Sequence, residues 1–107
     1  MFINKYLNET YLDMLYDTYN EDFIHTLDEK NFTEVYNLLK SKGFYFIEDV
    51  ILKYLELFEI DPKYISLALD DIEKEFGKEY PTLIGKHITL MERVLNKAID
   101  YSLKEEL

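Results

Sequence analysis

Hydrophobic residues recur every three to four positions along almost the whole chain, which is the period of an α-helix rather than of a β-strand. Only two Pro and three Gly interrupt this pattern, and no internal repeat or linker divides it. We therefore predict an all-α fold in which residues 1–107 form a single compact bundle of four to five helices with a long C-terminal helix. Short connections favour antiparallel packing of neighbouring helices.

The first helix is expected over residues 3–19, followed by a short helix or turn over residues 21–27. Its apolar stripe consists of Ile3, Leu7, Tyr11, Met14 and Leu15. The opposite side of the same helix carries Leu12, Tyr16 and Tyr19. A helix that is apolar on two sides is usually sandwiched, either inside its own domain or against a partner protein. The sequence leaves both arrangements open.

The next helix is expected between residue 31 and Gly43. Asn31, followed three residues later by Glu34, has the pattern of a capping box, and Gly43 occupies the position of a left-handed stop. Residues 45–58 contain enough aromatic and β-branched side chains to resemble a strand. Their apolar positions nevertheless repeat at i, i+3, i+4 and i+7, which predicts a helix.

Asp61 and Pro62 open a further helix as N-cap and first helical residue, and Gly77 closes it. The last helix is expected over residues 80–104, which would make it roughly 35 Å long at about 1.5 Å per residue. We expect it to be the spine of the domain, packed against the two preceding helices. His87 falls within its apolar stripe and is expected to face the core.

The chain is strongly acidic, with a net charge of −10 and an isoelectric point of about 4.5, although 48% of its residues are hydrophobic. Such a surface favours a basic protein partner and disfavours anionic membranes and direct nucleic-acid binding. The two helices around Gly43 have the order of a helix-turn-helix. The second of them, however, begins with Glu48 and Asp49. These are the positions at which the recognition helix of a DNA-binding protein contacts the bases.

The absence of Cys excludes disulfides and thiolate sites and fits a reducing cytosol. The N-terminal residues lack the pattern of a signal peptide, and no stretch reaches the length of a membrane span, so we expect a cytoplasmic protein. Arg occurs once while Lys, Asn, Ile and Tyr are abundant, which is typical of an AT-rich bacterial or phage genome.

The acidic helix over residues 62–76 is the first place to look for a chemical site. On a helical wheel only Asp71 and Glu75 share a face, while Asp70 lies above Lys74 as a favourable ion-pair partner. Two carboxylates without a neighbouring histidine make a poor catalytic or metal site. We therefore interpret this cluster as a solvated helix face.

Asp22 and His25 have the i, i+3 spacing of half a di-metal motif, but the sequence offers no second half. Glycine-rich phosphate loops and nucleophile turns are also missing from the sequence. We therefore expect no catalytic residue, no metal and no cofactor.

These patterns favour a non-catalytic protein that binds a basic protein partner, in the manner of an immunity protein, an antitoxin or a phage-encoded inhibitor. Charge would steer the association, and Tyr and Leu side chains would anchor it. The predicted binding residues are Leu12, Tyr16, Tyr19, Leu67, Asp70, Asp71 and Glu75. The alternative is a homo-oligomeric structural or regulatory module, such as a homo-dimer formed through the first helix. A carboxylate-bundle metal protein is a third interpretation.

Overall fold

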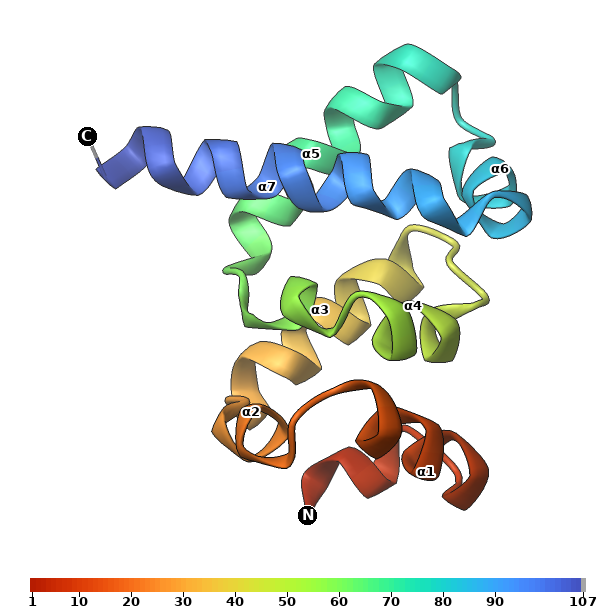
Figure 1. The fold of residues 1–107 in the computed structure, drawn as a ribbon. Helices are drawn as coiled ribbons and strands as arrows, with labels where there is room; N and C mark the ends of the chain where they lie inside the picture. The colour runs from red at the N-terminus through yellow and green to blue at the C-terminus, as the bar shows by residue number, and fades with distance from the viewer. Residues whose placement is uncertain (107) are drawn as a thin grey trace.

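Helices make up nearly all of the chain in the computed structural model, which describes the backbone of residues 1–106 and the side chains of residues 1–105 (Figure 1). The α-helices are α1 (Glu9–Thr18), α2 (Glu21–Thr26), α3 (Glu29–Ser41), α4 (Ile47–Lys53), α5 (Pro62–Phe76), α6 (Tyr80–Lys86) and α7 (Met91–Glu106). Three short 3-10 helices accompany them: η1 (Phe2–Lys5), η2 (Leu55–Glu59) and η3 (Ile88–Leu90). The predicted all-α fold with a long C-terminal helix is confirmed. The described chain contains seven α-helices instead of four to five, because the segment over residues 21–27 is helical and the last predicted helix is divided into two α-helices.

One apolar cluster forms the interior, and apart from Tyr54 and Tyr80 every buried side chain among the described residues is apolar. Within it, Phe32 of α3 and Phe58 of η2 stack with ring centroids 4.6 Å apart. Figure 1 shows α5 and α7 at one end of the molecule and η1, α1 and α2 at the other, with α3 and α4 between them. The particle measures 36 × 35 × 20 Å, so its thickness corresponds to about two helix diameters.

The predicted first helix is divided at Asn8. Its side chain accepts a hydrogen bond from the Tyr11 N–H at 2.9 Å and thereby caps α1, after η1 has already ended. The prediction of one helix over residues 3–19 is wrong because it overlooked this N-cap. Most of the predicted stripe is buried or partly buried, but Met14 is 48% exposed.

α3 begins earlier than a capping box at Asn31 implies. Asp28 is the N-cap, and its carboxylate accepts the Asn31 N–H at 2.8 Å. Asn31 lies inside the helix, where its side-chain amide donates to the carbonyl oxygens of Phe58 at 2.8 Å and Ile60 at 2.9 Å. The capping-box prediction is therefore wrong, since this asparagine ties α3 to the segment that precedes α5.

The segment predicted as one helix over residues 45–58 forms α4 and η2, which meet at Tyr54. The backbone of Tyr54 (φ −137°, ψ 51°) leaves the helical region, and the next N–H, that of Leu55, donates to the Tyr19 hydroxyl at 3.0 Å. A side chain far away in the sequence thus satisfies the amide that the interruption exposes. Burial raises the pKa of Tyr19 to about 12, although the hydrogen bond from Leu55 opposes this shift.

The predicted last helix is divided as well, into α6, η3 and α7. His87 stands at the first interruption with φ −136° and ψ 73°, and its side chain is exposed. The prediction that His87 faces the core is therefore wrong. α7 itself has 16 residues, which corresponds to about 24 Å. It packs mainly along α5.

Several helix ends follow the local sequence signals. Asp61 caps α5 by accepting the Lys63 N–H at 3.0 Å, with Pro62 in the first turn. Gly77 ends α5 with a φ of 88°, and Gly43 follows α3 with a φ of 95°. Both values lie in the left-handed region, which glycine adopts without steric cost. These predictions are confirmed.

We expect Asn31→Ala to destabilise the protein by about 1–3 kcal/mol, because two carbonyl oxygens lose a side-chain donor. Asn37→Ala is the matched control, since Asn37 is exposed on the same helix. Urea unfolding followed by circular dichroism measures both variants. Equally small effects of the two substitutions would show that the Asn31 amide contributes no stability.

Candidate functional site

Two of the predicted partner-binding acids connect α5 to α7. The Tyr101 hydroxyl donates to Asp71 at 2.5 Å, and the Arg93 guanidinium pairs with Glu75 at 2.5 Å. Arg93 also lies over the ring of Phe76, 5.3 Å from its centroid. Asp71 and Glu75 share a face of α5, as the helical wheel predicts, but this face is turned toward another helix of the same chain.

A third polar contact lies where α5 begins and α7 ends. Lys63 pairs with Glu105 at 3.3 Å, and hydrogen bonds from Tyr64 and Lys63 lower the pKa of Glu105. Lys63 and Glu105 are exposed, so water and salt screen their attraction. The three contacts orient the two helices on each other more than they stabilise the fold.

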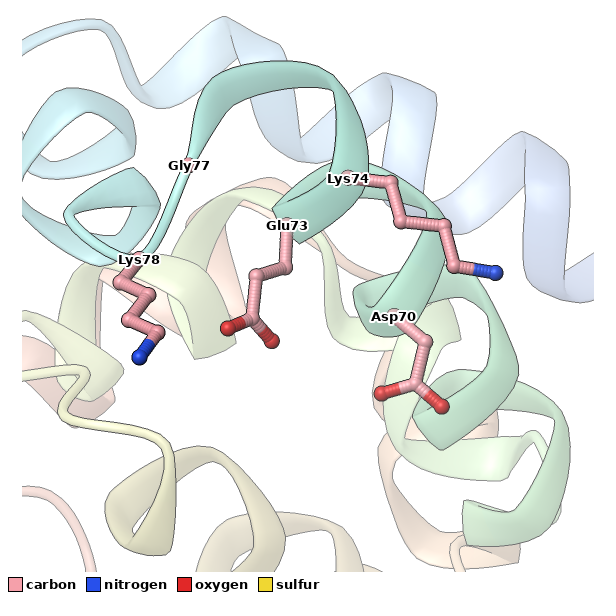
Figure 2. A pocket seen from close by; sticks show the side chains of 5 residues that line it. All are labelled: Asp70, Glu73, Lys74, Gly77 and Lys78. Carbon is pink, nitrogen blue, oxygen red and sulfur yellow. The ribbon is translucent and has the colours of Figure 1, made fainter.

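Asp70 and Glu73 lie on the other flank of α5. Together with Lys74, Gly77 and Lys78 they line a shallow hollow of about 410 Å³, and Figure 2 shows both carboxylates extending to the same side of the helix. Neither carboxylate lies within 4.0 Å of a cationic group among the described side chains. The predicted ion pair between Asp70 and Lys74 is therefore not formed, and the acids of the hollow are not neutralised at short range.

Tyr80, the first residue of α6, is buried close to the same two acids. Burial, and after it the negative charges of Glu73 and Asp70, raise the pKa of Tyr80 to about 12. The negative charges at the hollow therefore also disfavour ionisation of Tyr80, a buried side chain.

Leu67 lies on the outer side of α5, between its two acidic flanks, and is 44% exposed. A single exposed leucine is ordinary on a protein surface. Of the four predicted binding residues on α5, Leu67 and Asp70 are accessible to a partner, whereas Asp71 and Glu75 are engaged by α7.

The three predicted binding residues of the first helix are divided between interior and surface. Leu12 is partly buried against the core, and the Tyr19 hydroxyl is bound by the Leu55 N–H. Tyr16 is 39% exposed, and its hydroxyl contacts the Met1 sulfur at 3.5 Å. Tyr16 is therefore the member of this group that a partner reaches most easily.

A row of acids that sequence reasoning missed runs along α1 beside Tyr16. Glu9, Asp13 and Asp17 follow one another at i, i+4 and i+8, so they share one face of the helix, and all three are exposed. None of the three forms an ion pair within 4.0 Å among the described side chains. Like charges at this spacing destabilise a helix by about 0.2–0.5 kcal/mol per pair. The spacing is visible in the sequence, since the helix predicted over residues 3–19 already contains all three acids.

The two predicted groups of binding residues do not form one surface. α1 and α5 lie at opposite ends of the molecule, with α3 and α4 between them (Figure 1). A short segment of a partner protein therefore meets either the α1 surface or the α5 surface.

Asp22 and His25 are exposed on α2, and His25 lies 3.7 Å from the carboxylate of Glu21. Within the described part of the chain, no three His, Cys, Asp or Glu side chains are grouped so that they could hold a metal ion. None of the described helices is both long enough and apolar enough to cross a membrane.

We expect the free energy of unfolding to fall as the pH rises from about 10 to 12, partly because of Tyr80. Its pKa is about 12 in the folded protein against an ordinary value of 10.0, so unfolding releases a proton in this range. Below pH 10 the hydroxyl is neutral in both states, and stability does not depend on it. Tyr80→Phe should therefore lose less stability than the wild type between about pH 10 and 12 in urea unfolding. Identical losses would contradict the assignment of this dependence to Tyr80.

Comparisons with protein-family models, with curated proteins and with solved structures found no match for this chain. Its function is therefore inferred from its own residues. The two surfaces on which that inference can draw are the acidic row of α1 and the hollow beside α5.

Proposed function

We propose that this protein is a non-catalytic cytoplasmic binding protein that captures a basic segment of another protein on the outer face of α1. The observation that carries the proposal is the row of three acids, Glu9, Asp13 and Asp17, next to the exposed ring of Tyr16. Among the described side chains none of the three forms an ion pair. We call this surface, with Leu12 at its edge, the α1 acidic face.

Repulsion between its carboxylates makes the α1 acidic face favourable for cations. Asp13 has a like charge four residues before it and another four residues after it. Asp17 stands in the last turn of α1, where the helix dipole is negative and no basic residue is present. A cationic side chain bound across the row relieves both repulsions. The net charge of −10 adds a long-range field that speeds the approach of a basic partner.

Tyr16 adds an apolar contact that salt does not screen. Tyrosine is favoured at protein interfaces because it combines a large apolar area with a polar tip. Tyr16 and Met1 touch each other and are 39% and 50% exposed, so a partner can bury both in one contact. Charge would thus bring the partner to the surface, and the ring would hold it there.

The hollows of the described chain support binding over catalysis. The larger one is lined by solvated lysines and carboxylates, and the smaller one, of about 110 Å³, likewise mixes both charges. An active site needs an acid or base held next to a nucleophile or a metal. In the smaller hollow the Asp71 carboxylate lies next to the Tyr101 hydroxyl, but this contact joins α5 to α7 and so supports the packing of the two helices. A small acidic protein that covers a basic surface of another protein would act as an immunity protein, an antitoxin or a phage-encoded inhibitor does.

Charge reversal on the α1 acidic face tests the proposal. The probe is a synthetic lysine-rich peptide with one leucine, titrated by isothermal calorimetry at low and at physiological salt. We expect the variant Asp13→Lys/Asp17→Lys to bind about tenfold more weakly, by a margin that shrinks at higher salt. The matched control is Glu92→Lys/Asp100→Lys, which makes the same change of net charge at two exposed acids of α7.

Equal weakening by the control variant would mean that net charge governs binding, and the proposal would then fail.

Tyr16→Ala separates the contribution of the apolar contact from that of the long-range attraction between charges. We expect it to speed dissociation of the peptide while leaving the association rate close to that of the wild type in stopped-flow experiments. The natural partner is then sought as a basic protein that the wild type retains from a cell lysate and the Asp13→Lys/Asp17→Lys variant loses.

A further inference from the structure

Seven large apolar side chains of the described chain are exposed, and the largest group of them lies at α1. They are Met1, Met14, Tyr16, Tyr45, Leu67, Ile99 and Leu103. Tyr45, in the loop between α3 and α4, has its hydroxyl end against Gly85 of α6. Met1 and Tyr16 touch each other, and Met14 lies on the same helix as Tyr16. Two of the three exposed apolar side chains at α1 are therefore methionines.

All sulfur atoms of this chain belong to three methionines, because the sequence contains no Cys. Met91, at the start of α7, is fully buried, whereas Met1 and Met14 are 50% and 48% exposed. Oxidation of sulfur in proteins follows its exposure. A dissolved oxidant therefore reaches the sulfur atoms of Met1 and Met14 and is kept from that of Met91 by the packed core.

The two exposed methionines border the α1 acidic face on opposite sides. Met14 comes three residues before Asp17 and lies beside it on the helix surface. Tyr16 comes three residues after Asp13 and lies on the other side of the acidic row. The Tyr16 hydroxyl donates to the Met1 sulfur at 3.5 Å, which places Met1 on the Tyr16 side. The acids of the row thus have a thioether on each flank.

We propose that Met1 and Met14 are oxidation sites through which hydrogen peroxide weakens binding at the α1 acidic face, an inference that rests on the proposed function of that face. A lone pair of the sulfur attacks one peroxide oxygen, so that an S–O bond forms while the O–O bond breaks. The sulfur gives up two electrons and becomes a sulfoxide. The departing hydroxide takes the proton of the transferred oxygen and leaves as water.

Oxidation changes the contact that a partner would bury. A thioether sulfur is a weak hydrogen-bond acceptor, whereas a sulfoxide is polar and disrupts interfaces that contain methionine. The Tyr16 hydroxyl already donates to the Met1 sulfur, so the new oxygen is attached to the atom that this hydroxyl contacts. Burying the sulfoxide beside an apolar side chain of the partner removes water from its oxygen, which costs free energy. The same cost arises at Met14.

The charge of the face stays the same, because a thioether and its sulfoxide are both neutral. Glu9, Asp13 and Asp17 therefore attract a basic segment as before, and the association rate stays close to that of the reduced protein. The lost apolar contact acts on the bound complex, so dissociation becomes faster. Oxidation thus removes the part of the binding that salt does not screen.

Mild treatment with hydrogen peroxide, followed by peptide mass spectrometry and by titration with the lysine-rich peptide, tests the inference. We expect Met1 and Met14 to be converted to sulfoxides well before Met91, with an unchanged circular dichroism spectrum. The oxidised protein should bind the peptide about tenfold more weakly, mainly through faster dissociation in stopped-flow experiments. Methionine sulfoxide reductases, one for each sulfoxide epimer, should restore the affinity.

Three control proteins assign the effect to the exposed sulfur atoms. Met91→Leu keeps both exposed methionines and should lose as much affinity on oxidation as the wild type. Met14→Leu leaves Met1 as the exposed sulfur and should lose less. Protein in which norleucine replaces every methionine keeps a side chain of similar shape without sulfur, and peroxide should leave its affinity unchanged.

The outcomes separate this inference from the proposed function. Reduced protein that binds the peptide, together with oxidised protein that binds it equally well, would overturn the inference and leave the proposed function standing. Conversion of Met91 as fast as Met1 and Met14 would overturn the assignment of the oxidation sites. Reduced protein that does not bind the peptide at all would overturn the proposed function and, with it, the regulation inferred here.

Discussion

The interior of this protein accepts almost only apolar side chains, and the arrangement of its surface depends on this constraint. Twenty-two acidic residues must remain in contact with water in a chain of 107 residues, because a buried carboxylate without a partner is very costly. The particle is only about two helix diameters thick, so each helix has an outer side on which such residues can lie. The acids therefore lie on the exterior because the core excludes charged groups, and their field attracts cations.

The same interior also limits where the helices can be interrupted. Each interruption leaves backbone groups that must find partners, and a core without charged groups provides few. Polar side chains at its margin provide them instead: Asn8 caps α1, the Tyr19 hydroxyl accepts the Leu55 N–H, and the Asn31 amide binds two carbonyl oxygens before α5. These three polar side chains, which do not belong to the apolar stripes, thus connect the segments on either side of the interruptions.

Local signals in the sequence were sufficient for the fold class and for several helix ends. Helical periodicity predicted an all-α chain, and Asp61, Gly77 and Gly43 marked ends that the structure confirms. The interruptions at Tyr54 and His87 were not predictable in this way, because the group that stabilises the first one, Tyr19, is far away in the sequence. Periodicity continues through such interruptions, since the residues on both sides face the same core.

The binding residues show a similar limit. A helical wheel placed Asp71 and Glu75 on one face correctly, but it cannot show where a neighbouring helix crosses, and α7 lies on that face. The acidic row of α1 could have been found with the same wheel, because Glu9, Asp13 and Asp17 all lie inside the predicted first helix. Positions relative to a helix's own stripe follow from sequence, whereas contacts between helices follow from packing.

At position 85, in helix α6, the usual preference of helices for alanine over glycine is reversed. Alanine is normally preferred to glycine inside a helix by about 1 kcal/mol. In α6 the added methyl group would occupy the space where the end of the Tyr45 ring rests, and the ring would have to swing outward into water. The absence of one methyl group in one helix thus decides where an aromatic side chain of a different segment comes to rest.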